Sequence, residues 1–213
     1  MADISPGQYP TFPSFGSVTI TTVTPGYQTE TMAGKVRRVA QGHSYYTWEA
    51  KYSSLTPYEA GRVQGFLAQA LGPFLSFEIV LPEISYSNNP LSVTANASLV
   101  TANAVVAGSK GVLVKNTGLL QGDTFMYAGD FFKFGGNISG NTKVYMCTQD
   151  VSVFANGNAF IGFSGSAVSN VTVNTPVTIN AVPFTAIISE DSQEYSVGSG
   201  GMTTMTVKMR EVW

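Results

Sequence analysis

The stretch "TPYEAGRVQGFLAQALGPF" at residues 56–74 decides the fold, because it is the one clear helix signal in a chain rich in strand patterns. Thr56 and Glu59 are the residue types of an N-cap and a capping-box carboxylate, with a proline in the first turn between them. Gly72 and the proline after it cannot continue the helix. One apolar stripe recurs at helical spacing: Val63, Phe66, Leu67, Ala70 and Leu71. The stretch predicts a helix over about 56–71 that covers one side of a core.

Strand patterns lie on both sides of this helix. In "YYTWEAKY" at residues 45–52 large or apolar residues alternate with mostly polar ones, which predicts a strand with one buried face. The segments at 17–23, 75–79 and 205–213 are also typical of strands. We therefore expect the helix to lie on a sheet that contains Trp48 and residues 75–79.

The composition changes in the middle of the chain. Residues 89–188 contain no Glu, Arg, His or Trp, and they consist of short strand patterns separated by turn residues. Such a pattern predicts a small all-β barrel or sandwich. The composition and strand pattern of the first segment return near the C-terminus. We therefore expect a discontinuous domain of residues 1–88 and 189–213, with residues 89–188 inserted.

Composition also restricts the function. Only 11% of the 213 residues are charged and the formal net charge is −2, so there is no basic footprint for sequence-specific nucleic acid binding. No apolar run is long enough for membrane insertion. Cys147 is the only cysteine, and the start "MADISPGQYP" does not have the pattern of a signal peptide, so we expect folding in a reducing cytoplasm. Low charge with 44% hydrophobic residues favours a protein that works in an assembly.

No catalytic, cofactor-binding or metal site is predicted. His43, the only histidine, precedes a strand, and Cys147 lies about a hundred residues away, so neither a hydrolytic triad nor a metal centre is expected. Asp123 and Asp130 each follow a glycine, which favours turns over a glycosidase pair. We expect no enzyme.

Two further features leave alternatives open. The inserted segment carries aromatic residues at strand positions, which either fill a barrel or stack on sugars; these are Phe125, Tyr127, Phe131, Phe132 and Phe134. The basic cluster "KVRR", with Lys35, Arg37 and Arg38, is either a solvated strand or loop face or a contact with acidic groups of a neighbouring subunit.

The layout of N-terminal strands, one capped helix, a further strand and a closing C-terminal strand resembles the tail-tube fold of tailed bacteriophages. The residues that carry the resemblance are "YYTWEAKY", "TPYEAGRVQGFLAQALGPFLSFEIVLPE" and "MTVKMREVW". The resemblance implies a mainly β fold, with a tail-tube-like β-sandwich, one flanking helix and an inserted β domain. An insertion of this kind is similar to distal tail proteins and related ring proteins of the tail tip or baseplate.

This resemblance implies a structural virion protein that is assembled in the host bacterial cytoplasm. It implies a homo-hexameric ring at the distal end of the tail, which joins the tail tube to the tip or baseplate hub around a central channel. The expected partners are the tail tube protein, hub or baseplate proteins and the tape measure protein. The alternatives are a carbohydrate-binding module for host-surface adhesion and a tail tube subunit.

Overall fold

The computed structural model describes residues 7–40, 42–95, 98–135, 142–190, 193–198 and 200–213. The fold is mainly β, with 41% of residues in strands and 10% helical, which confirms the predicted class. The chain divides into two compact units. Unit 1 consists of residues 1–79 and 185–212, and unit 2 consists of residues 80–184 with Trp213.

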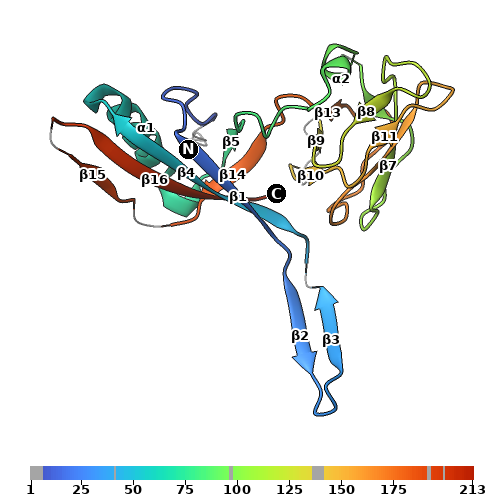
Figure 1. The fold of residues 1–213 in the computed structure, drawn as a ribbon, viewed down its shortest axis with the longest axis horizontal. Helices are drawn as coiled ribbons and strands as arrows, with labels where there is room; N and C mark the ends of the chain where they lie inside the picture. Colours follow the sequence, from blue (N-terminus) through green and yellow to red (C-terminus); the bar gives the residue numbers. More distant parts are fainter. Residues whose placement is uncertain (1–6, 41, 96–97, 136–141, 191–192, 199) are drawn as a thin grey trace, which may run out of the picture. The chain divides into compact units, whose positions relative to one another are not determined.

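Unit 1 is built on a six-stranded sheet (Figure 1). Its strands, in the order in which they pair, are β1 (Ser17–Val23), β4 (Tyr45–Leu55), β16 (Thr203–Glu211), β14 (Phe184–Ile188) and β5 (Phe77–Ile79), with β15 (Tyr195–Val197) also paired to β16. All of these pairings are antiparallel where the register is defined. β4 pairs with one edge of β16. The other edge of β16 is shared by β14 and β15.

The alternation seen in the sequence separates the two faces of this sheet. In β4 the side chains of Tyr46, Trp48, Ala50 and Tyr52 are buried, whereas the residues between them are exposed or half-buried. β16 alternates in the same way from Thr203 to Glu211. One face is therefore the core of unit 1 and the other is polar.

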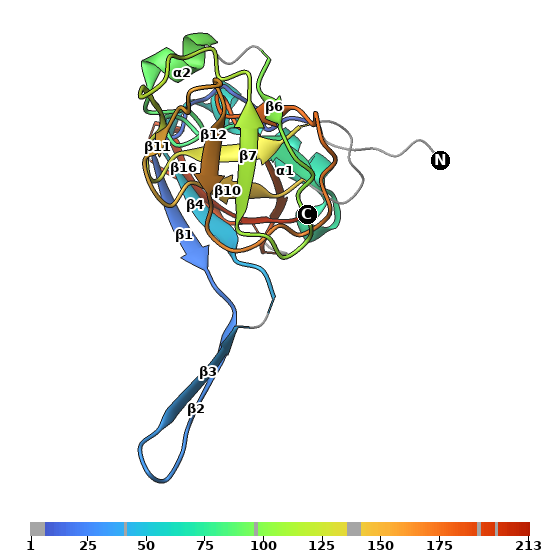
Figure 2. The same ribbon diagram turned by 90° about the vertical axis from the view of Figure 1, so that its right-hand side faces the viewer.

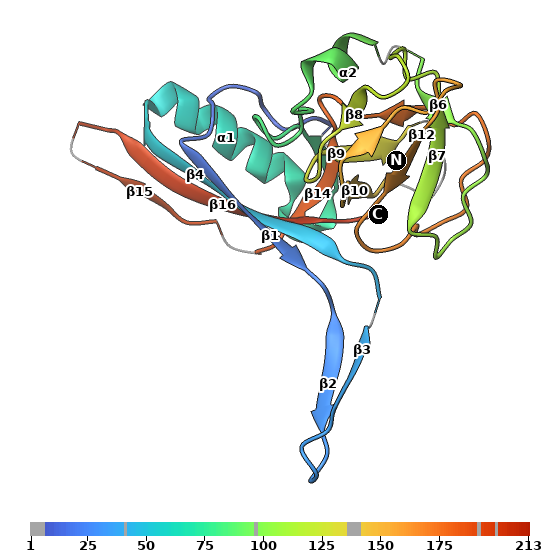
Figure 3. The same cartoon turned by 45° about the vertical axis from the view of Figure 1, so that its right-hand side comes forward.

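Helix α1 (Pro57–Ala70) covers the apolar face of the sheet (Figure 3). The capping box forms, since Glu59 N donates to Thr56 Oγ1 at 3.4 Å and Thr56 N donates to Glu59 Oε2 at 2.8 Å. The helix buries Ala60 and four of the five residues of the predicted stripe. The prediction was wrong for Leu71. This residue caps the helix in the left-handed conformation at φ 52° and is 61% exposed.

Aromatic rings join α1 to the sheet. The ring of Phe66 lies 5.1 Å from that of Phe77 in β5 and 4.9 Å from that of Tyr9. The Tyr52 hydroxyl donates to the Tyr9 hydroxyl at 3.1 Å, and burial raises the pKa of Tyr52 to about 12. In unit 1 the helix thus forms a layer on the apolar face of the sheet.

A two-stranded ribbon follows β1 and precedes β4. It consists of β2 (Gly26–Glu30) and β3 (Val36–Ala40), which pair only with each other in the described part of the chain. Figures 1, 2 and 3 all show it extending beyond the end of the six-stranded sheet. Every described side chain from Gly26 to Val39 is exposed, so the β2–β3 ribbon has no core of its own.

Unit 2 contains small antiparallel sheets around one apolar core. The sheets have the strand orders β10–β9–β13, β11–β8 and β12–β7–β6. These elements are β6 (Val100–Thr101), β7 (Gly111–Lys115), β8 (Thr124–Met126), β9 (Phe131–Phe134), β10 (Val144–Met146), β11 (Val151–Ser152), β12 (Ala159–Gly162) and β13 (Val177–Thr178). The rings of Phe132, Phe134, Tyr145 and Phe163 contact one another at the centre.

Three details differ from the sequence expectation. Residues 185–188, expected in the insertion, belong to unit 1, because β14 alternates buried and half-buried side chains and pairs with Met209–Glu211. Residues 80–88, expected in the first domain, belong to unit 2. The short helix α2 (Pro90–Ala95) is a second helix, beyond the one that the sequence pattern predicted. The unit boundaries thus fall after Ile79 and Phe184.

The ring contacts of Phe66 lead to a stability prediction. Truncation by Phe66→Ala should lower the free energy of unfolding by about 3–5 kcal/mol, because it leaves a cavity between α1 and β5. Phe74→Ala is the matched control, since Phe74 is 83% exposed, and it should cost no more than about 0.5 kcal/mol. Thermal melts of the two variants measure the difference, and equal melting temperatures would contradict this packing.

Candidate functional site

The residues considered for catalysis are divided between the two units. His43 is half-buried in the segment before β4 in unit 1, whereas Cys147 belongs to unit 2. Among the described residues no group of three or more His, Cys, Asp or Glu side chains is placed to hold a metal ion. Cys147 is buried and its Sγ donates to the Gln149 carbonyl at 3.0 Å. Burial raises the pKa of this thiol, so less of it is thiolate at a given pH.

Asp130 has a structural role. It is 1% exposed, and its carboxylate accepts hydrogen bonds from Ser87 Oγ at 3.0 Å, Asn88 Nδ2 at 2.6 Å and the backbone N of Asn88 and Tyr127 at 3.2 Å. The carboxylate thereby ties the segment before α2 to the turn before β9. Asp123 accepts from Leu120 N at 3.0 Å within its own turn. Each aspartate thus stabilises a turn, as the preceding glycines indicated.

The aromatic residues proposed for sugar stacking are mostly in the core of unit 2. Phe125, Phe131, Phe132 and Phe134 are all at most 8% exposed. Tyr127, at 41%, is the one of the five with an accessible ring. Phe125, Phe132 and Phe134 therefore belong to the core cluster of unit 2, and Phe131 is buried outside that cluster, so none of these four rings is available to a ligand.

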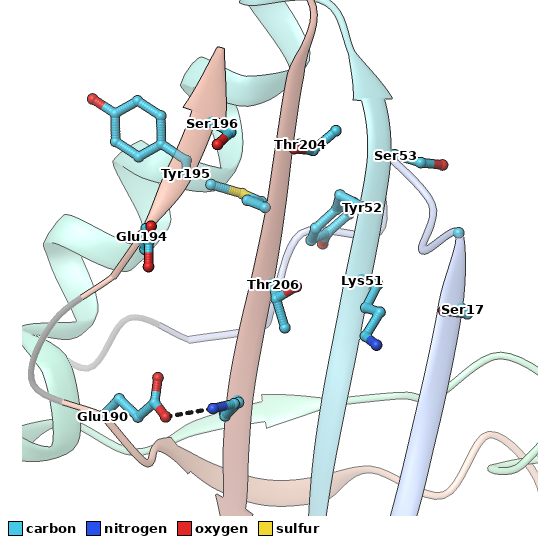
Figure 4. A pocket seen from close by; sticks show the side chains of 13 residues that line it. Ser17, Lys51, Tyr52, Ser53, Glu190, Glu194, Tyr195, Ser196, Thr204 and Thr206 are labelled. Atoms are coloured by element: carbon cyan, nitrogen blue, oxygen red, sulfur yellow. Dashed lines mark hydrogen bonds and ion pairs between the residues drawn. The ribbon is translucent and has the colours of Figure 1, made fainter. Parts of the chain in front are cut away.

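A groove lies over the polar face of the sheet of unit 1 (Figure 4). It has a volume of about 590 Å³ and crosses β15, β16, β4 and β1. Hydroxyl side chains dominate the wall, and Ser17, Lys51 and Thr206 form one row across three strands.

The charges on this face are mixed. Lys208 Nζ lies 2.8 Å from Glu190 Oε1, and Lys51 Nζ lies 3.4 Å from Glu49 Oε1. The hydrogen bond to Glu190 raises the pKa of Lys208. Because both signs occur side by side, the groove offers neither a strong cation site nor a strong anion site.

The two outer strands of the sheet differ in how their edges are covered. At β5, Tyr9 N donates to Glu78 O at 2.8 Å and Glu78 N donates to Gly7 O at 2.9 Å, so the N-terminal segment covers that edge. β1 pairs with β4 alone in the described part of the chain, and β15 likewise pairs with β16 alone. Among the described residues, the edges of β1 and β15 are therefore left open.

A second groove lies on the helix side of β15. Its volume is about 320 Å³, and its apolar lining includes Leu67, Ala68, Leu71, Tyr195 and Met205. Leu71 and Tyr195 are 61% and 51% exposed, which is high for such large side chains. The sequence pattern did not indicate this groove, because it depends on the pairing of β15 with β16.

The basic cluster lies on the β2–β3 ribbon. Lys35 is in its turn, Arg37 and Arg38 are in β3, and all three side chains are exposed. The register pairs Arg37 with Thr29 and Arg38 with Gln28, so the two arginines point to opposite faces of the ribbon. No ion pair in the described part of the chain includes them.

Comparison of the sequence with protein-family models and with curated proteins finds no match. In the part of the chain that the structure describes, neither helix reaches the length and hydropathy that crossing a membrane requires. The open edges, the two grooves and the exposed ribbon are therefore the features on which a function can be argued.

The hydrogen bonds of Asp130 lead to a second stability prediction. Asp130→Ala should destabilise unit 2 by about 1.5–3 kcal/mol, because it removes the charged acceptor of four hydrogen bonds. Asp123→Ala, which removes one such bond in a more exposed turn, should cost about 1 kcal/mol or less. Urea unfolding followed by tyrosine fluorescence measures both; similar losses in the two variants would show that Asp130 is no more than a turn residue.

Proposed function

We propose that this chain is a structural subunit that assembles edge to edge with copies of itself into a closed ring. Its place would be the distal end of a phage tail, between the tail tube and the tip or baseplate hub, as the resemblance of its layout implies. A tail tube subunit is the alternative that uses the same assembly. The observation that carries the proposal is the open edge of β1.

Strand β1 has none of the features that keep a sheet edge from pairing. Its seven residues, SVTITTV, include no charge and no proline, and the strand has an unbroken register with β4. Natural edge strands are usually protected by lysine, proline, a bulge or a covering segment. The edge at β5 is covered, whereas no residue that the structure describes covers the outer edge of β1. Such an edge is expected to pair with a strand of another chain.

The strand directions suit pairing of β1 with β15 of the next copy. β1 is antiparallel to β4, and β4 is antiparallel to β16, so β1 runs parallel to β16. β15 pairs directly with β16 and runs antiparallel to it. Rotation of a copy about an axis along the strands keeps these directions. The β15 of the neighbour then lies antiparallel to β1, and repeating this head-to-tail contact closes a ring if the rotation divides a full turn.

The two faces of the sheet would have different places in such a ring. Helix α1 adds a layer to the apolar face of the sheet. This thicker face would lie on the outside of the ring, where the circumference is longer. The polar face would then line the channel, with hydroxyl groups and paired charges such as Lys208 and Glu190. A wall of mixed charge holds neither DNA nor a tape measure protein strongly, which suits passage through a channel.

The structure gives little support to the carbohydrate-binding alternative, because most of the aromatic rings on which it depended are buried. It depended on five aromatic residues of the inserted segment, and four of them are buried, three of these in the core of unit 2. The proposal includes no catalytic residue and no cofactor, and its partners are further copies of the chain and neighbouring tail proteins.

Adding charge to the open edge tests the proposal. The wild-type protein should form closed oligomers in native mass spectrometry, whereas Thr19→Lys with Thr21→Lys should remain monomeric, because lysines at an edge prevent strand pairing. Both residues are exposed, so the melting temperature of the monomer should change little.

Ser53→Lys with Thr204→Lys is the matched control for this experiment. It places the same two charges on exposed positions of the same polar face, but on the inner strands β4 and β16. This variant should assemble like the wild type. A monomeric wild-type protein, or assembly of the double lysine variant at wild-type concentrations, would contradict the proposed function.

A further inference from the structure

We infer that Phe12 of one copy packs into the apolar groove beside β15 of the next copy in the ring. This inference rests on the proposed edge pairing and adds a side-chain contact to it. β15 has only three residues, which span about 10 Å of strand. Such a short edge buries far less than the roughly 1,200 Å² of a stable interface. The ring therefore needs further contact area next to the paired strands.

The groove is apolar and of a size for one aromatic ring. Helix α1 contributes Leu67, Ala68 and Leu71 to its lining, and the sheet contributes Tyr195 and Met205. Its volume of about 320 Å³ is at the small end of ligand pockets. None of the described residues that line it is charged. An uncharged ring therefore suits this groove better than a charged group, which would lose its hydration there.

Phe12 lies on the opposite flank of the same helix. It is 46% exposed, and the guanidinium carbon of Arg62 lies over its ring, 5.7 Å from the centroid. Arg62 and Gln64, which lines the groove, are two residues apart on α1 and so about 200° apart around the helix axis. The helix therefore separates the Phe12 ring from the groove of its own chain, and another copy must supply the ring that fills it.

The segment before β1, which carries this ring, lies at the level of the groove along the sheet. Met205 in the groove pairs with Tyr52 of β4. On the other side of β4, Ser17 at the start of β1 pairs with Lys51, and the ring of Phe15 lies 5.2 Å from that of Tyr52. Rotation about an axis along the strands keeps these levels, so the segment of one copy meets the groove of the next.

Edge pairing also brings the two features to the same side of the sheet. Tyr195 is opposite the buried Met205, so its ring lies on the helix side of β15. The segment before β1 packs on the same side through Phe15 and Tyr52. When β1 of one copy pairs with β15 of the next, an exposed aromatic residue faces an apolar groove across the joined edge. Packing Phe12 there removes its apolar area from water.

Disulfide capture within mixed rings tests the contact. One chain carries Thr11→Cys, which leaves the Phe12 ring in place, and the other carries Ala68→Cys; both positions are exposed, and the native Cys147 is buried. The two chains are co-expressed with different affinity tags, so that both enter the same rings, and are oxidised after purification. The mixed disulfide should exceed that of a control with Gly65→Cys in place of Ala68→Cys by about tenfold, because docking raises the local thiol concentration.

Gly65 is a matched control position. It is exposed on the same helix, it does not line the groove, and an added Cβ would lie in open space. A further change tests the ring itself. Phe12→Ala in the Thr11→Cys chain should lower the yield to that of the control, whereas Phe12→Leu should retain most of it, since an apolar side chain still fills the groove.

The outcomes separate this contact from the edge pairing. Equal yields for the Ala68→Cys and Gly65→Cys pairs would overturn this inference. If the wild-type protein still forms closed rings in that case, the proposed edge pairing stands. A monomeric protein with no capture of either kind would contradict both.

Discussion

The open backbone edge of β1 is the constraint on which the rest of unit 1 depends. Backbone N–H and C=O groups must be paired or hydrated, and a long uncharged edge strand is a template for another strand. The N-terminal segment covers the opposite edge at β5, while β1 and β15 are left open on either side of β4 and β16. A sheet with two such edges of compatible direction can be extended by copies of itself.

The helix makes this extension directional. Because Phe66, Phe77 and Tyr9 join α1 to one face, the sheet has a thick apolar side and a thin polar side. The same helix forms one wall of the groove beside β15, next to an open edge. The packing that stabilises unit 1 thereby also shapes the surface beside the edge of β15.

The sequence predicted those parts of the fold that depend on local patterns. The capping residues Thr56 and Glu59 located α1, and the alternation in residues 45–52 identified the buried face of β4. Pairing between distant segments left no such pattern, so β14 was expected in the inserted domain. In β9 all four residues are buried, and alternation therefore could not separate core aromatic residues from accessible ones. The ribbon and the groove likewise follow from strand pairing, which a local pattern does not encode.

The most direct test of edge pairing is a disulfide between β1 and β15. Ser17 and Ser196 both lie on the polar face, but within one chain β4 and β16 separate their strands by about 14 Å, too far for a disulfide. A chain with Ser17→Cys and Ser196→Cys, or with Thr19→Cys and Ser196→Cys to sample the register, can therefore link only to other chains. On oxidation we predict covalent ladders that end at the size of the closed ring. Monomers alone from both variants, with their thiols still reactive, would contradict the account.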